Sequence, residues 1–325
     1  MRRLLTTWAG LAALVLVVLP SLLGRGCTAR TPPPQASPEG GLTVSVYFPD
    51  TGQIRTLPLD EYLVGVVAAE MPPRFADEAL RAQFVVARTY TVKHMRRFGG
   101  GGCSLEPRAD VCASPGAGQA YTDFDALRQK LGYWAARRYW TRLQEQARAT
   151  RGLLVTYRGQ PIDAVYHATS GVMTEDAAAV WGRPVPYLRP VPDPYGKDAP
   201  NYVEEVAFAT ADLARALGID PRRLAGGSDP PVVILGRTPG GRVAQVRVGG
   251  LTLAGTEFRT RLGLRSADFT VRTERGRVVI TTRGYGHGVG LSQWGANGMA
   301  RAGKTFREIL AHYYPGTEVE PIFEG

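Results

Sequence analysis

A glutamate at the end of a predicted helix is the strongest candidate for chemistry in this sequence. Leu59, Leu63, Val66 and Val67 recur at spacings of three and four, which marks one apolar helix face. Glu70 continues that face in the last turn. Apolar surroundings and the negative end of the helix dipole both disfavour its ionised form. The spacing therefore predicts a raised pKa, which suits a general acid near neutral pH, whereas the alternative is a solvated carboxylate at a frayed helix end.

Two further segments carry polar side chains of functional type. A second helix, predicted over residues 77–98, contains Arg88 and Tyr90, which are suited to binding sugar hydroxyls or carboxylates, although Arg88 could equally pair with a nearby carboxylate. A predicted strand then ends in small polar residues, where Ser170 could act as a nucleophile with His167 as its base. Spacing alone leaves these alternatives open.

Residues 283–296 form the most unusual segment, because four glycines alternate with other residues just before a predicted helix. Glycine allows close backbone approach, and a helix start offers free N–H groups to an anion or a sugar oxygen. The segment is not a phosphate loop, since no Lys-Ser/Thr pair follows the glycines. His287 is a possible metal ligand without a second ligand at helical spacing. Trp181 and Trp294 are candidates for stacking on sugar rings or for the core.

The predicted elements indicate an α+β fold of mixed helices and antiparallel sheet, since helices gather in the first half and strands in the second. A hairpin is expected over residues 43–57, and Pro72 ends the first helix. Residues 123–150 are expected to form one or two helices with Trp134 on the buried side. Further strands are expected at residues 153–157, 162–167, 202–208, 232–235, 242–248, 269–273 and 278–282, and helices at 211–217, 292–302 and 306–313.

The amino terminus indicates export. Arg2 and Arg3 precede residues 4–23, which carry no charge and are long enough to cross a bilayer. The sequence therefore predicts a membrane anchor or signal segment over residues 1–27, a Pro/Ser/Gly-rich linker over 28–41, a domain over 42–317 and a tail over 318–325. The net charge of +10 in 325 residues favours an anionic partner, and export argues against nucleic acid.

The assembled motifs resemble the stage II sporulation protein D and amidase-enhancer (SpoIID/LytB) family. The resemblance begins at Tyr62-Leu63-Val64-Gly65-Val66-Val67-Ala68-Ala69-Glu70-Met71-Pro72 and continues through Glu78–Gln83, Ala87–Tyr90, Ser170-Gly171 and Thr174-Glu175. It extends over Trp181-Gly182, Pro186–Leu188 and Arg261–Leu264, and it closes on Gly284–Ala296. It covers about residues 42–314 in order.

This resemblance implies a lytic transglycosylase that cleaves peptidoglycan glycan strands in a glycan-binding groove, with Glu70 as the catalytic acid and base. It also implies a single-pass protein of the cell membrane, with its domain outside the cytoplasm, in spore engulfment beside a partner amidase/endopeptidase. No cofactor is implied. We expect the sugar to be held by side chains from both halves of the chain: Arg88, Tyr90, Ser170, Glu175, Trp181, His287, Ser292, Gln293 and Trp294.

One departure concerns the loop after the second helix, where some relatives carry a His-Cys and His-Cys zinc constellation. Here only Cys112 matches this pattern, so a zinc site is not favoured, although Cys103 and His94 are also potential zinc ligands. A disulfide between Cys103 and Cys112 is the preferred hypothesis. Two functional alternatives remain. The protein could be a non-catalytic, wall-binding enhancer of an amidase, or it could hydrolyse the glycan with Glu175 as a second carboxylate.

Overall fold

The computed structural model describes residues 41–224 and 230–321, so the expected anchor and nearly all of the linker lie outside the described residues. Among the described residues, no helix has both the length and the apolar character needed to cross a membrane. The described residues from 42 onward lie in one compact unit of helices and small sheets, which confirms the α+β class. Its apolar side chains form two main cores, which we call the first core and the second core.

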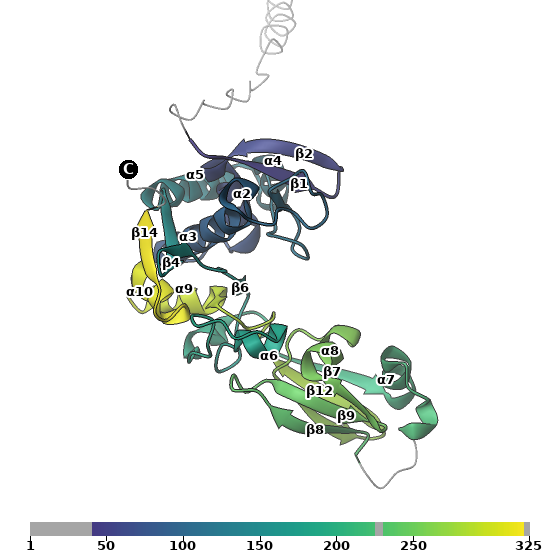
Figure 1. The fold of residues 1–325 in the computed structure, drawn as a ribbon. Helices are drawn as coiled ribbons and strands as arrows, with labels where there is room; N and C mark the ends of the chain where they lie inside the picture. The colour runs from purple at the N-terminus through teal and green to yellow at the C-terminus, as the bar shows by residue number, and fades with distance from the viewer. Residues whose placement is uncertain (1–40, 225–229, 322–325) are drawn as a thin grey trace, which may run out of the picture. The chain divides into compact units, whose positions relative to one another are not determined.

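The first core lies between helices and short sheets drawn from both ends of the unit (Figure 1). The helices are α2 (Leu59–Glu70), α3 (Asp77–His94), α4 (Phe124–Leu131), α5 (Tyr133–Ala149), α9 (Gln293–Arg301) and α10 (Phe306–Tyr313). The strands are β1 (Thr43–Phe48), β2 (Gln53–Pro58), β3 (Val111–Cys112), β4 (Leu153–Tyr157), β5 (Gln160–Pro161) and β14 (Glu318–Pro321). β1 and β2 pair antiparallel, as expected, and β3 pairs parallel to β1.

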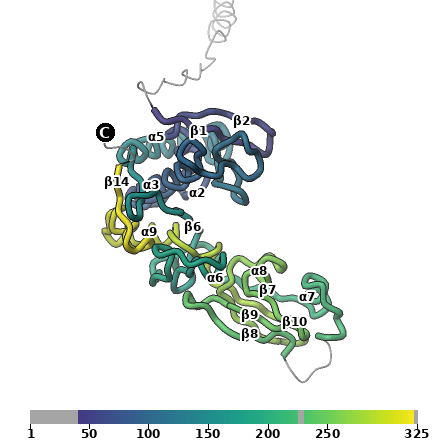
Figure 2. Tube along the Cα trace, in the orientation of Figure 1, coloured from purple at the N-terminus to yellow at the C-terminus, as the bar shows by residue number. Residues whose placement is uncertain are grey.

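The carboxyl end of the chain returns to the first core, as the tube in Figure 2 shows. Helices α9 and α10 pack against α3, and β14 pairs antiparallel with β4. Residues 318–321, which we expected to begin a tail, are therefore a strand of the domain. Since α2 and α9 both contribute to this core, residues near positions 70 and 293 can meet.

The second core is enclosed by two three-stranded sheets and two short helices. One sheet has the order β11 (Phe269–Glu274), β12 (Arg277–Arg283) and β7 (Val203–Ala209). The other has the order β10 (Leu251–Ala254), β9 (Val243–Val248) and β8 (Val232–Arg237). All four pairings are antiparallel, and α7 (Thr210–Leu217) and α8 (Gly255–Arg261) contribute Leu213 and Phe258 to the core.

Loops and short elements connect, along the chain, the segments that form the first core with those that form the second core. They include the two-residue strands β6 (Tyr166–His167) and β13 (Leu291–Ser292), which pair parallel, together with α6 (Ala177–Trp181) and the 3₁₀ helix η2 (Pro194–Asp198). The parallel pair brings residues far apart in sequence together, because Tyr166 lies opposite Leu291 and His167 opposite Ser292.

Three expectations about elements need correction. The strand expected over residues 162–167 is present only as the two-residue strand β6, because residues 162–165 are not paired as a strand. The second helix ends at His94, and the 3₁₀ helix η1 (Arg96–Phe98) follows after Met95. Trp134 is 77% exposed, although Leu127, Tyr139 and Leu143 of the same expected stripe are buried. The stripe fails at Trp134 because α4 ends at Leu131 and α5 begins at Tyr133, so the helical phase restarts at Gly132.

Candidate active site

The carboxyl group of Glu70 receives hydrogen bonds from three separate segments of the chain. The backbone N–H of Ala120 and the hydroxyl of Tyr166 donate to Oε1 over 3.1 and 3.3 Å. The side-chain amide of Gln293 donates to Oε2 over 3.2 Å. Glu70 itself is only partly buried. The structure therefore brings together one carboxyl group and three neutral donors, and Gln293 is the predicted sugar-binding residue that contacts it.

Helix α2 places this carboxyl group by ending at a defined point. The N–H of Met71 still donates to the Val67 carbonyl over 2.9 Å, but Met71 itself is extended, as expected of a residue before proline. The hydroxyl of Tyr139 on α5 then donates to the Met71 carbonyl over 2.7 Å. Met71, the residue that follows Glu70, is thus held by hydrogen bonds to both its backbone N–H and its carbonyl.

The segment that follows a disulfide-closed loop supplies the backbone donor. Cys103 and Cys112 are joined by a disulfide, which answers the choice that the sequence left open. The N–H of Gln119 donates to the Cys112 carbonyl over 3.3 Å, and Ala120 follows directly. Gly118 lies so close to that carbonyl that a Cβ there would be 2.2 Å from its oxygen. Residues 118–120 therefore pack against Cys112 on one side and reach Glu70 on the other.

The parallel pair of β6 and β13 positions Tyr166. His287 lies beside this pair and donates from Nε2 to the Tyr166 carbonyl over 2.9 Å, while its Nδ1 accepts from the Val289 N–H over 3.0 Å. Burial lowers the pKa of His287 to about 4, so the ring is neutral at physiological pH. His287 thus supports Tyr166 through the backbone.

The glycine-rich loop and a helix cap position Gln293. Gly290 has a φ of +72°, and a Cβ there would lie 2.2 Å from the Val165 carbonyl oxygen, so only glycine allows this approach. Ser292 caps α9, because its hydroxyl accepts from the Gly295 N–H over 3.1 Å. Ser292 is fully buried and acts in positioning Gln293, so the expectation that it contacts sugar was wrong.

Burial is the main influence on the charge of Glu70 and raises its pKa. The bonds from Gln293, Ala120 and Tyr166, in that order, oppose this shift because they stabilise the carboxylate. Among the described residues, no basic side chain forms an ion pair with Glu70. A carboxyl group that holds its proton more strongly than usual, yet has donors ready for its ionised form, can act first as an acid and then as a base.

Several other predicted binding residues have structural roles. Arg88 is 1% exposed; its guanidinium pairs with Asp60 over 3.2 Å and donates to the Thr150 carbonyl over 2.7 Å, which confirms the simpler alternative and excludes contact with substrate. Tyr90 is mostly buried and stacks on His94. His94 donates from Nδ1 to the Tyr90 carbonyl, so this ring is engaged within its own helix.

Ser170 and Glu175 are also committed to the interior. Ser170 is fully buried, and its hydroxyl donates to Nε2 of His167 over 2.8 Å, so the predicted pair forms where no substrate reaches it. Glu175 is 1% exposed and accepts from the N–H groups of Asp176 and Gly240 and from the Thr238 hydroxyl. Neither residue is available to a glycan.

Both predicted stacking tryptophans remain accessible. Trp181 is 48% exposed, and its ring lies 5.3 Å from that of His287, which in turn holds Tyr166. Trp294 is half-buried in a T-shaped contact with Phe75, and the Arg74 guanidinium lies 4.8 Å from the centre of its ring. Aromatic side chains therefore flank the segments that carry Tyr166 and Gln293.

Sequence reasoning missed Tyr166 and Ala120. Tyr166 reads as an ordinary strand residue, and only its position four residues before Ser170 in the resembling segment could have drawn attention to it. Ala120 acts through its backbone, for which side-chain chemistry gives no signal. Tyr62, another buried tyrosine near Glu70, was seen only as part of the motif; burial raises its pKa and the charge of Glu70 adds to that shift.

Comparison with known proteins places this geometry in a family. The family model described as "Stage II sporulation protein" matches residues 47–157, which include Glu70 and Ala120. Stage II sporulation protein D of Bacillus subtilis is 37% identical over 289 residues, covering 88% of this chain and 80% of the relative. The same protein of Bacillus amyloliquefaciens is 37% identical over 281 residues, covering 86% and 79%. The chain belongs to the stage II sporulation protein D family.

A more distant member of the comparison is the amidase enhancer of Bacillus subtilis, which is 26% identical over 306 residues, covering 78% of this chain and 40% of the relative. Family membership and this relative together support a role at the cell wall. Within the described residues, no group of three or more His, Cys, Asp or Glu side chains gathers in a way that could hold a metal ion.

Proposed function

We propose that this protein is a lytic transglycosylase of peptidoglycan that uses Glu70 as both acid and base. The observation that carries the proposal is the convergence of three neutral donors on one carboxyl group whose pKa burial raises. A general acid needs the raised pKa, and the same group needs hydrogen-bond donors once it has lost its proton. The glycan-binding groove that the resemblance implies belongs to this proposal.

The reaction proceeds in two proton transfers at Glu70. The protonated carboxyl group first gives its proton to the glycosidic oxygen as the bond from C1 of N-acetylmuramic acid to O4 of N-acetylglucosamine breaks. The resulting carboxylate then takes the proton of the muramoyl C6 hydroxyl, while the oxygen of that hydroxyl forms a bond to C1 of the same sugar. The products are a 1,6-anhydromuramoyl end and a free C4 hydroxyl, and Glu70 recovers its proton. Ala120, Tyr166 and Gln293 stabilise the carboxylate between the two steps.

The surroundings of Glu175 favour this mechanism over hydrolysis. Glycosidases that hydrolyse their substrate usually use two carboxyl groups on either side of the bond. The second carboxylate that we considered, Glu175, is buried and already accepts from Asp176, Thr238 and Gly240. A mechanism with one carboxyl group and an internal nucleophile on the sugar needs no such partner.

Trp181 and Trp294 are proposed to contact sugar rings on either side of the cleaved bond, with Gln293 beside them at Glu70. An aromatic face suits the apolar face of a pyranose. Trp181 is backed by the ring of His287, and Trp294 is held between Phe75 and Arg74. We propose His287 as a residue that supports Tyr166 and Trp181 rather than as a metal ligand or an acid.

We further propose that residues 4–23 anchor the protein in the cell membrane, with the domain outside the cytoplasm. The family supports a role in spore engulfment, beside a partner amidase/endopeptidase that removes stem peptides. The basic surface of the chain, with a net charge of +10, suits the lactyl carboxylates of peptide-free strands.

The test is mass spectrometry of peptide-free glycan strands after incubation with residues 30–325. The wild type should release 1,6-anhydromuramoyl ends, and Glu70→Gln should reduce their rate of formation by about 10²- to 10⁴-fold, the usual contribution of a general acid. Glu61→Gln, an exposed change on the same helix, should leave the rate unchanged. Reducing ends in place of anhydro ends would indicate hydrolysis instead.

The alternative is a non-catalytic enhancer of a partner amidase that binds the wall. The amidase-enhancer relative favours this alternative, although it is more distant than the sporulation proteins. Strands that stay intact with both the wild type and Glu70→Gln, despite tight binding, would establish the enhancer and reject the enzyme.

A further inference from the structure

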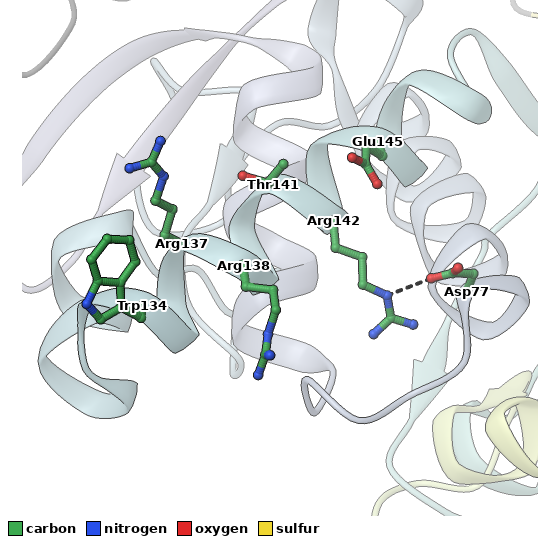
Figure 3. Close-up of a pocket in the computed structure, with 7 residues that line it drawn as sticks. All are labelled: Asp77, Trp134, Arg137, Arg138, Thr141, Arg142 and Glu145. Carbon is green, nitrogen blue, oxygen red and sulfur yellow. Dashed lines mark hydrogen bonds and ion pairs between the residues drawn. The ribbon is translucent and has the colours of Figure 1, made fainter.

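The exposed face of helix α5 carries a hollow of about 550 Å³ that takes no part in the site at Glu70 (Figure 3). Its lining residues are Asp77, Trp134, Arg137, Arg138, Thr141, Arg142 and Glu145. The hollow is shallow and open to solvent, so it suits one sugar unit of a longer strand and does not enclose a free small molecule. We define these seven residues as the α5 hollow.

The indole ring of Trp134 lines this hollow. It is 77% exposed, which is unusual for a residue that normally buries most of its large apolar surface. The ring of Tyr133 meets it edge-on at a centroid distance of 5.1 Å, and Tyr133 in turn packs edge-on against Phe124. The indole is therefore supported from one side while its remaining surface is open to a ligand.

The arginines of the hollow differ in how far they are engaged. Arg142 is fully committed, since it pairs with Asp77 over 2.7 Å and donates to the carbonyls of Pro73 and Phe75. Arg138, which Figure 3 shows between Trp134 and Arg142, has no hydrogen-bond or ion-pair partner among the described residues. An available guanidinium beside an exposed aromatic ring suits a ligand that joins a carboxylate to an apolar ring face.

A second, smaller hollow of about 240 Å³ continues this surface toward the active site. Arg138 and Arg142 line both hollows, and Pro73, three residues after Glu70, lines the second. Tyr139 also lines the second hollow, and its hydroxyl donates to the Met71 carbonyl. The surface thus runs from the exposed Trp134 to the segment that follows the proposed catalytic residue.

We propose that the α5 hollow binds a carboxylate-bearing sugar of the glycan strand, with the pyranose face on Trp134 and the carboxylate on Arg138. This inference rests on the proposed function, because the ligand is the same glycan. It adds a binding site away from the cleaved bond, through which the protein would hold long strands more tightly than short ones.

The test compares binding by the full chain carrying Glu70→Gln, so that no strand is cleaved, with the same chain carrying Trp134→Ala and Arg138→Ala. The probes are peptide-free glycan strands, the same strands with methyl-esterified carboxylates, and polyglycerol phosphate as an anion without pyranose rings. The double change should weaken binding of the native strands by roughly tenfold, and esterification should weaken their binding to the parent. Arg148→Ala, an exposed change on the same helix outside the hollow, should keep the parent's affinity.

Equal affinity of the double variant and its parent for native strands would overturn the proposal. So would polyglycerol phosphate that binds the parent as tightly as the glycan and loses affinity equally in the double variant. Because binding is measured without cleavage, a failed cleavage assay would overturn the proposed activity and leave this binding result to stand by itself.

Discussion

At the scale of single residues, the proton affinity of Glu70 is the quantity on which the proposed reaction depends. Burial raises its pKa, while donors that prefer the carboxylate lower it. The pKa of Glu70 is therefore set by two opposing effects, burial and hydrogen bonds to the carboxylate. Each donor can be removed separately, which makes the balance measurable.

We expect Tyr166→Phe to move the pH profile of cleavage to higher pH. The general acid must be protonated, so the turnover number kcat falls as the pH rises through the pKa of Glu70, which lies above that of an ordinary glutamate. The Tyr166 hydroxyl stabilises the carboxylate, so removing it raises the pKa of Glu70 further. The alkaline limb of the profile then moves to higher pH.

The measurement is kcat against pH for the wild type, Tyr166→Phe and Tyr195→Phe. Tyr195 is 39% exposed, and its hydroxyl forms no hydrogen bond among the described residues, so the last profile should match that of the wild type. An alkaline limb that stays in place or moves to lower pH in Tyr166→Phe would refute the role assigned to its hydroxyl.

At the scale of elements, the disulfide loop has a role that extends to the active site. The disulfide ties Cys112 to Cys103, the Cys112 carbonyl accepts from the Gln119 N–H, and the next residue is Ala120, which donates to Glu70. Breaking the disulfide should therefore weaken the hydrogen bond from Ala120 to Glu70, although neither cysteine forms a hydrogen bond with Glu70 itself.

We expect the paired change Cys103→Ser and Cys112→Ser to lower the free energy of unfolding by about 2–3 kcal/mol. It should also reduce strand cleavage by roughly tenfold, because the Ala120 donor is held less firmly. Thermal unfolding and the rate of anhydro-end formation check the two effects. All of these proteins are compared as full chains, because the control Cys27→Ser changes the remaining cysteine, which lies before residue 30. Cleavage that is unchanged in the paired variant while stability falls would separate the loop from catalysis.

Elements bounded by strong local signals could be predicted, whereas short long-range contacts could not. Helices α2 and α10 have the expected ends, because Pro72 follows the first and Thr305 caps the second with Glu308. The strands β6 and β13 are two residues each and exist only because they pair with each other. No local periodicity marks such strands.

The same division applies to the site. Glu70 could be identified because its position on an apolar stripe is a local pattern, and Gln293 because it lies in a distinctive motif. Arg88 was misjudged because pairing with Asp60, 28 residues earlier, is invisible in spacing. Ser292 was misjudged because a capping hydroxyl and a sugar-binding hydroxyl look alike in sequence.

At the scale of the whole molecule, Gly290 marks the point where distant parts of the chain close on each other. It approaches the Val165 carbonyl, 125 residues earlier, and the β6 and β13 pair begins beside this contact. The site at Glu70 depends on this closure, since Tyr166 and Gln293 lie on its two sides.

We expect Gly290→Ala to lower the free energy of unfolding by about 2–4 kcal/mol, because the new Cβ meets a backbone oxygen and the φ of +72° is unfavourable. The matched control is Gly303→Ala, where φ is +87° but no atom lies within 4 Å; this change should cost only about 1 kcal/mol. Chemical denaturation of both variants checks the difference. Equal losses would show that the backbone conformation, and not the close approach, explains the requirement for glycine.

The hydrogen bond from Gln293 to Glu70 joins residues 223 positions apart, and this separation has a consequence for biogenesis. Contacts between such distant residues form late in folding, because the intervening chain must first lose its freedom. A growing or incompletely folded chain therefore lacks the assembled centre even when its first helices are in place. The proposed cleavage of glycan strands therefore requires that nearly the entire polypeptide has been made and folded, so a partly made chain is inactive in the proposed reaction.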